Sequence, residues 1–145
     1  SLSFGLYNKI CKFRMSIFLI IQREVFTMLI LLVENNIDEL RNLQRYVSEC
    51  YTDSDIVPFS DSSDAMQFIQ SDRFSIDLCF TKIMMPSVSG FKIAKELKIK
   101  NPYAKIVFIE DTPEYAGEAW KYGASDYIVT PVTKAAVNHA KIACG

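Results

Sequence analysis

Histidine, paired cysteines and glycine-rich phosphate loops are scarce or missing in this chain. The single histidine, His139, argues against a histidine-based metal site and a Ser-His catalytic triad. The four cysteines lie far apart and form no CxxC pair, which excludes zinc-binding and redox motifs and favours a reduced, cytoplasmic location. No GxGxxG or GxxxxGK(S/T) motif follows the first apolar strand, so nucleotide binding of those kinds is excluded as well.

The chain also lacks a large excess of charge of either sign and long apolar runs. The chain has 16 basic and 17 acidic residues, and its net charge of −1 gives no overall electrostatic attraction to nucleic acid. No apolar run approaches the roughly 20 residues that a membrane-spanning helix requires. Half of the 145 residues are nevertheless hydrophobic, which is enough for the core of one folded domain. We therefore expect a single domain that neither binds nucleic acid directly nor spans a membrane.

The first 27 residues differ from the remainder. They carry four basic residues and one acid, a net charge of +3, whereas residues 28–145 carry a net charge of −4. Apolar residues recur in this segment at steps of three and four, the spacing of one helical face: Leu6, Ile10, Phe13, Ile17 and Ile20. We interpret residues 1–27 as a basic amphipathic extension upstream of a natural start at Met28, followed by the domain at 28–145. The alternatives are a helix that packs on the domain or on a second chain, and a helix on a membrane surface.

From Met28 onward, short apolar runs alternate with helical patterns. The runs predict strands at 29–33, 56–59, 77–81, 105–109 and 125–129, and the 3.6-residue periodicity predicts helices at 38–51, 63–70, 91–100, 113–122 and 134–143. Five strands that are each followed by a helix imply parallel pairing with right-handed crossovers. The predicted fold is therefore an α/β three-layer sandwich with a five-stranded parallel sheet.

Polar residues follow four of these strands. Glu34 and Asn35 come after the first strand, Lys82 after the third, Glu110 after the fourth and Thr130 after the fifth. Ligands of open parallel sheets bind at the carboxyl ends of the strands. We expect these five side chains to gather at one edge of the sheet.

Two stretches of the chain resemble a known family. Ile83-Met-Met-Pro-Ser-Val-Ser-Gly90 and Gly123-Ala-Ser-Asp-Tyr-Ile-Val-Thr-Pro131 are similar to the loops around the third and fifth strands of the receiver domain of two-component response regulators. The resemblance covers residues 29–143 and implies the flavodoxin-like (CheY-like) strand order 2-1-3-4-5. The stretch 113–123 is similar to LytTR-type regulators, which usually carry a DNA-binding output domain after the receiver.

The resemblance also implies a phosphorylation chemistry. In the family, two acids after the first strand and an aspartate after the third hold Mg²⁺, and that aspartate accepts a phosphoryl group from a histidine kinase. A hydroxyl after the fourth strand and a lysine after the fifth bind the phosphoryl oxygens. An aromatic residue on the fifth strand takes part in the switch that reads out the phosphorylated state.

This sequence departs from the family pattern at most of these positions. The acid pair is Glu34 and Asn35, the phosphoacceptor position is Lys82, and the phosphoryl-binding positions are Glu110 and Thr130. Tyr127 does match the switch aromatic. We therefore predict a receiver-like domain that has lost its Mg²⁺ site, needs no cofactor and works without phosphorylation.

The charges suggest what replaces the metal. An ammonium at position 82 repels Mg²⁺, and its pairing with Glu34, Glu110 or both would supply an internal cation instead. A buried pair of this kind need not add net stability, but removal of one member leaves an unpaired buried charge. Three alternatives remain at this stage. Lys82 could point into solvent, Tyr127 could be only a half-buried sheet aromatic, and a small enzyme on the same fold could use Lys82 with Glu34 or Glu110.

The partners expected from the resemblance are an output domain or separate protein, a histidine kinase and a second copy of the chain. Contacts would use the face formed by the helix at 113–122, the strand at 125–129 and the last helix. That face would carry four aromatic residues: Tyr115, Trp120, Tyr122 and Tyr127. Aromatic anchors among small residues suit a protein interface. The alternative is that Trp120 and Ala116, four residues apart, only cover the sheet.

Overall fold

The computed structural model describes residues 27–145 and contains one five-stranded sheet. All neighbouring strands pair in parallel, in the order β2-β1-β3-β4-β5, so the predicted fold class and strand order are confirmed. The elements along the chain are β1 (Met28–Val33), α2 (Ile37–Cys50), β2 (Ser54–Phe59), α3 (Ser62–Gln70), β3 (Leu78–Lys82), α4 (Gly90–Lys100), β4 (Lys105–Glu110), the 3₁₀ turn η1 (Pro113–Tyr115), α5 (Ala116–Lys121), β5 (Ala124–Val129) and α6 (Lys134–Cys144).

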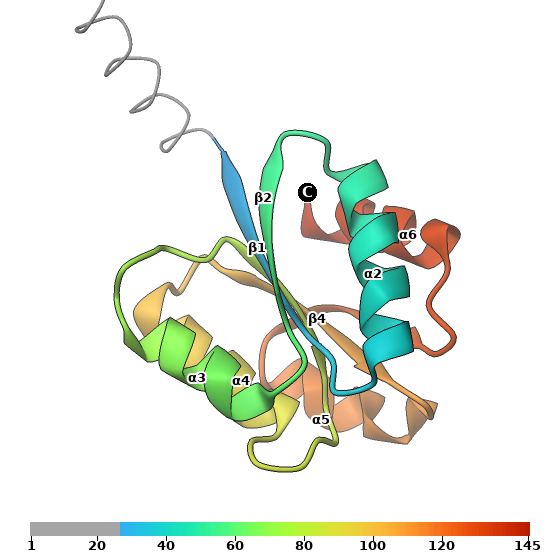
Figure 1. Cartoon of the computed structure of the whole chain (residues 1–145). Coiled ribbons are helices and arrows are strands. Elements are labelled where there is room, and N and C mark those ends of the chain that lie inside the picture. Colours follow the sequence, from blue (N-terminus) through green and yellow to red (C-terminus); the bar gives the residue numbers. More distant parts are fainter. Residues whose placement is uncertain (1–26) are drawn as a thin grey trace, which may run out of the picture.

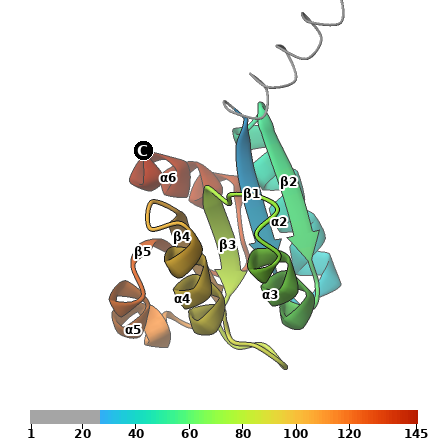
Figure 2. The ribbon, with the colours of Figure 1, turned by 90° about the vertical axis from the view of Figure 1, so that its left-hand side faces the viewer.

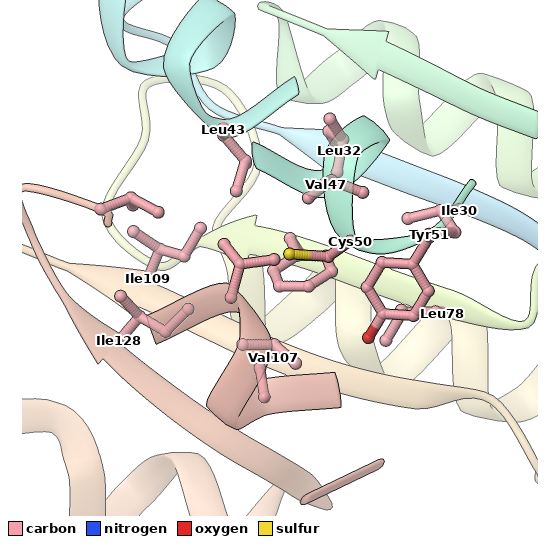
Figure 3. Packing of buried hydrophobic residues seen from close by; sticks show 14 of the residues in the cluster. Ile30, Leu32, Leu43, Val47, Cys50, Tyr51, Leu78, Val107, Ile109 and Ile128 are labelled. Atoms are coloured by element: carbon pink, nitrogen blue, oxygen red, sulfur yellow. The ribbon is translucent and has the colours of Figure 1, made fainter. Parts of the chain in front are cut away.

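Helices cover both faces of the sheet. Helices α2 and α6 lie on one face, and α3, α4 and α5 lie on the other (Figures 1 and 2). Most residues of the three inner strands are buried and apolar, as expected for a sheet covered on both sides. On the α2 face, Leu43 and Val47 pack against Leu32, Ile109 and other strand residues (Figure 3). The helical periodicity of α2 is confirmed, because all four residues expected to face inward are buried: Leu40, Leu43, Val47 and Cys50.

Side chains of the favoured cap types begin four of the α-helices. Asn36, Asp61, Ser89 and Thr133 each accept a hydrogen bond from a backbone N–H in the first turn. Such caps satisfy donors that the helix itself leaves unpaired. The caps fix where each helix starts, and they thereby fix the short loops between the strand ends and the helices.

Two expectations about local structure need correction. The predicted helix at 113–122 is instead the 3₁₀ turn η1 followed by the short helix α5, although Thr112 does cap its start through the N–H of Glu114. Lys82 ends strand β3 rather than following it. The expectations for residues 1–26 lie outside the described residues. Between residues 27 and 145, no helix is long and apolar enough to cross a membrane.

Candidate functional site at the carboxyl edge of the sheet

The parallel sheet brings the predicted polar residues to one edge. In the strand register Val33, the residue before Glu34, is opposite Thr81, the residue before Lys82. Lys82 is opposite Ile109, so Glu110 comes one step further along β4. The edge therefore has acid, base and acid on three neighbouring strands, in the spatial order of Glu34, Lys82 and Glu110.

Lys82 and Glu34 form an ion pair at this edge. The Lys82 ammonium nitrogen lies 3.8 Å from Glu34 Oε1, and the exposed fractions of the two side chains are 15% and 3%. This contact confirms the expected salt bridge between Lys82 and Glu34, and Lys82 does not point into bulk solvent. The separation is too long for a hydrogen bond, so the attraction is mainly coulombic.

Glu34 also interacts with the start of α2. Its Oε1 accepts a hydrogen bond of 2.9 Å from the backbone N–H of Asn36. Burial raises the pKa of the Glu34 carboxyl above its usual value, and the Asn36 N–H and the charge of Lys82 both act in the opposite direction. These two partners thus offset part of the cost of ionising the buried carboxyl group. Asn35, the other residue of the expected acid pair, is exposed.

Glu110 is buried but makes a different contact. Its Oε2 accepts a 2.9 Å hydrogen bond from the backbone N–H of Met84. The backbone N–H of Ile83 donates to the carbonyl of Ile109 next to it. The carboxylate of Glu110 therefore fastens the loop after β3 to the end of β4. No salt bridge joins it to Lys82 within residues 27–145, so Glu34 is the ion-pair partner of the lysine.

Thr130 lies at the far end of the same edge and contacts an acid that sequence reasoning missed. Its hydroxyl donates to Asp111 Oδ1 at 2.7 Å, and its backbone N–H donates to the carbonyl of Glu110 at 2.9 Å. Asp111 directly follows Glu110, so the rule that selected residues at strand ends would have found it had the rule been extended by one position. The loops after β4 and β5 are joined by this pair.

The loop between β3 and α4 has a second anchor that the sequence did not reveal. Ser62, at the start of α3, is buried, and its hydroxyl oxygen accepts a hydrogen bond from the N–H of Val88. Ser87 has a φ of +35°, in the left-handed region, where a residue with a side chain is rare. No local pattern marks Ser62, because its role depends on a loop 26 residues further along the chain.

Tyr127 links β5 to the segment before η1. Its hydroxyl donates to the carbonyl oxygen of Thr112 at 2.5 Å, and its ring packs against the core on the α4 face. Burial, followed by the charge of Glu110, raises the pKa of the phenol. The ring is neither free in solvent nor fully buried, and its hydroxyl holds the loop that follows β4.

These residues do not fit a bound Mg²⁺. Magnesium requires several oxygen ligands in octahedral geometry, usually including carboxylates. Here the one carboxylate after β1 faces an ammonium and a backbone N–H, and Asn35 turns outward. Across the described part of the chain, no group of three or more His, Cys, Asp or Glu residues is arranged to hold a metal ion.

The sequence model for the response regulator receiver domain matches residues 30–141, which is most of the chain. The chain belongs to this family. Response regulator receiver domains are a signalling family rather than a catalytic one, so the alternative of a small enzyme that uses Lys82 is wrong.

A curated relative agrees with this assignment, and solved structures share the fold. The chain is 31% identical over 105 residues to the transcriptional regulatory protein YpdB of Escherichia coli K12. The matched region covers 72% of this chain and 42% of the relative. It thus spans less than half the length of that relative. A response regulator receiver domain protein from Clostridium thermocellum superimposes with a TM-score of 0.69 at 24% identity, covering 81% of this chain and 94% of that one. For the chemotaxis response regulator CheY4 of Vibrio cholerae, the TM-score is 0.69 at 15% identity, with coverages of 82% and 99%.

Proposed function

We propose that this receiver domain signals through protein contacts without being phosphorylated at residue 82. The observation that carries the proposal is the Lys82 ammonium, which sits at the end of β3 and 3.8 Å from Glu34. Acyl-phosphate formation requires a carboxylate oxygen as the nucleophile, and an ammonium nitrogen cannot form that product. The position that the family resemblance assigns to the acceptor is therefore chemically unsuited to it.

The ion pair supports a fixed rather than a switched pocket. A phosphorylated receiver gains negative charge and new hydrogen bonds that reposition neighbouring loops. In this domain a permanent cation already faces Glu34, while Glu110 holds the loop after β3 and Thr130 holds Asp111. We infer that Lys82 and Glu34 take the place of Mg²⁺ and acceptor as an internal charge pair, with no cofactor.

The proposed output is control of transcription through a partner domain. The likeness of residues 113–123 to LytTR-type regulators and the name of the YpdB relative, a transcriptional regulatory protein, support this assignment. A histidine kinase that docks without transferring phosphate and a second copy of the chain are the other proposed partners. The proposed location is the cytoplasm, which agrees with the free cysteines Cys50, Cys79 and Cys144. A reading frame that continues into a LytTR-type domain after Gly145 would support the transcriptional role, and an unrelated domain there would contradict it.

Treatment with acetyl phosphate and Mg²⁺, followed by intact-mass spectrometry, tests the loss of phosphorylation. We expect no hydroxylamine-sensitive phosphoryl adduct on the protein. The matched control restores the family residues in the same scaffold, with Asn35→Asp, Lys82→Asp, Glu110→Thr and Thr130→Lys together. A stoichiometric adduct on the natural sequence would overturn the proposal, and an adduct on the restored variant alone would support it.

A further inference from the structure

A shallow hollow between α4 and α5 lies away from the carboxyl edge of the sheet. It encloses about 530 Å³ and is open to solvent. The two helices stand next to each other on the same face of the sheet (Figure 2). Its lining consists of Lys95, Lys98, Ile99, Lys121, Tyr122 and Gly123. Half of these residues are lysines, although residues 28–145 as a whole carry a net charge of −4.

The floor of this hollow is built from an aromatic ring and a glycine turn. The Tyr122 ring stacks on Phe91 with ring centroids 4.6 Å apart, and it is half-buried. Gly123 has a φ of +78°, and a Cβ at that position would come within 3.2 Å of the Lys98 side chain. The glycine thus allows the Lys98 stem to lie against the turn. Ile99, in contrast, is 65% exposed at the rim of the hollow.

The positive charges of the lysines in the hollow are not balanced by salt bridges with acids in the described residues 27–145. Lys98 donates to the carbonyl of Ala104, and desolvation followed by the charge of Lys105 lowers its pKa. Neither Lys95 nor Lys121 forms a salt bridge with any residue of the described range 27–145. Lysines in the last turn of a helix interact favourably with its dipole. This interaction accounts for the positions of Lys98 in α4 and Lys121 in α5. Lys95 stands in the middle of α4, where that explanation does not apply.

We propose that this hollow, defined by Lys95, Lys98, Ile99, Lys121, Tyr122 and Gly123, binds an acidic segment of a partner protein that inserts an apolar side chain. Carboxylates of the segment would pair with Lys95 and Lys121, and its apolar side chain would cover Ile99 and Tyr122. An apolar floor with a charged rim is the usual anatomy of a protein interface. A peptide is favoured over nucleic acid because it supplies an aliphatic or aromatic side chain for Ile99 and Tyr122 together with its carboxylates. The inference is independent of whether residue 82 accepts phosphate.

A defined peptide probes the proposal directly. The probe is fluorescein-labelled Asp-Glu-Leu-Asp-Phe-Glu-Asp, titrated with the whole chain and followed by fluorescence anisotropy. Backbone amide shifts then locate the bound peptide. We expect binding, with the largest shifts at Ile99 and Tyr122. The same peptide with both apolar residues replaced by serine should bind more weakly.

Single charge reversals separate this hollow from general electrostatics. Lys95→Glu and Lys121→Glu should each raise the Kd of the peptide by about three- to tenfold, because a repulsion replaces an attraction. Arg41→Glu makes the same charge change on an exposed residue of α2, on the other face of the sheet, and should leave the Kd nearly unchanged. The proposal would be overturned if all three variants weakened peptide binding equally or if no binding of the peptide were detected. Amide shifts confined to another surface would overturn it as well. So would lysine-dependent binding of a thymidine oligonucleotide or of phosphatidylserine vesicles without binding of the peptide.

Discussion

Gly90 packs directly on the carbonyl group of Lys82. A Cβ at position 90 would stand 2.0 Å from the Lys82 oxygen and 2.9 Å from Ile83 Cα, both of them backbone atoms that cannot yield easily. The N–H of Gly90 also donates to the carbonyl of Ile83. The absence of a side chain at residue 90 therefore allows α4 to start against the end of β3, where Lys82 faces Glu34.

Gly90→Ala should accordingly destabilise the domain. Overpacking of a tight site typically costs about 1–3 kcal/mol, and this contact is with backbone rather than with a flexible side chain. Gly117→Ala is the matched control, because a Cβ at residue 117 meets nothing within 4 Å and alanine favours a helix. Urea denaturation of both variants measures the difference. Equal midpoints for the two would show that the loop after β3 can move aside.

Lys82→Met should lower the free energy of unfolding at neutral pH. It leaves the buried Glu34 carboxylate without its cation, a loss of about 1–3 kcal/mol, below the roughly 3–5 kcal/mol of a fully buried pair because Lys82 is partly exposed. Lys134→Met removes the lysine of the exposed pair with Glu49 and should change stability by less than about 0.5 kcal/mol. Urea titrations of both variants provide the comparison. A loss as small for Lys82→Met as for Lys134→Met would mean that the pair is not needed to hold Glu34.

The effect of Lys82→Met should depend on pH in a defined direction. The folded-state pKa of Glu34 is raised above the value of 4.5 expected in the unfolded chain, so this group favours the folded state at low pH and loses that contribution as pH rises through its folded-state pKa. Removal of Lys82 raises that pKa further. The deficit of the variant should therefore be large at neutral pH and shrink on acidification towards pH 4.5. A deficit that is constant over this range would contradict the assignment.

Glu110→Ala should release the loop after β3. The Met84 N–H loses its acceptor, and removal of one partner of a buried hydrogen bond costs about 1–3 kcal/mol. Hydrogen exchange at the Met84 amide should accelerate. Glu110→Gln keeps a carbonyl oxygen at the same place and should retain most of the protection. Slow exchange in the alanine variant would show that other contacts suffice to hold this loop.

Tyr127→Phe should loosen the segment around η1. The variant keeps the ring but loses the hydrogen bond to the Thr112 carbonyl, a contribution of about 0.5–1.5 kcal/mol. Backbone amides of residues 112–116 should exchange faster in NMR measurements. Tyr103→Phe serves as the control, because this side chain is 87% exposed and its hydroxyl has no hydrogen-bond partner among residues 27–145. Identical exchange in both variants would leave Tyr127 as a packing residue only.

Trp120→Ala should change self-association rather than folding. Trp120 is 57% exposed, and Ala119 instead covers the sheet with no exposed surface, so the alternative of a core role for Trp120 with Ala116 is wrong. If the face of α5, β5 and α6 pairs two copies, the variant should shift the equilibrium towards monomer. Sedimentation velocity over a concentration series measures the shift, and circular dichroism checks the fold. The same mass distribution for both proteins would exclude Trp120 from a dimer contact.

The sequence alone was sufficient to predict the fold and the edge where the polar residues meet. The apolar runs 29–33 and 106–109 are typical of strands covered on both faces, and alternation with helices implies that such strands are parallel. Parallel strands end at the same edge, which places Glu34, Lys82 and Glu110 together without further information. That placement leaves both Glu34 and Glu110 as candidate partners of Lys82.

Only the tertiary structure decided which partners these side chains have. Glu110 accepts from the Met84 N–H because the loop after β3 continues alongside the end of β4, and this loop is also held by Ser62 and by the close approach of Gly90. The orientation of α5 is another example. The 3₁₀ turn at 113–115 precedes α5, and in the resulting orientation Ala119 is buried and Trp120 exposed. Hydrophobic periodicity specifies that a face must be buried, but the choice of residue depends on contacts between segments far apart in the chain.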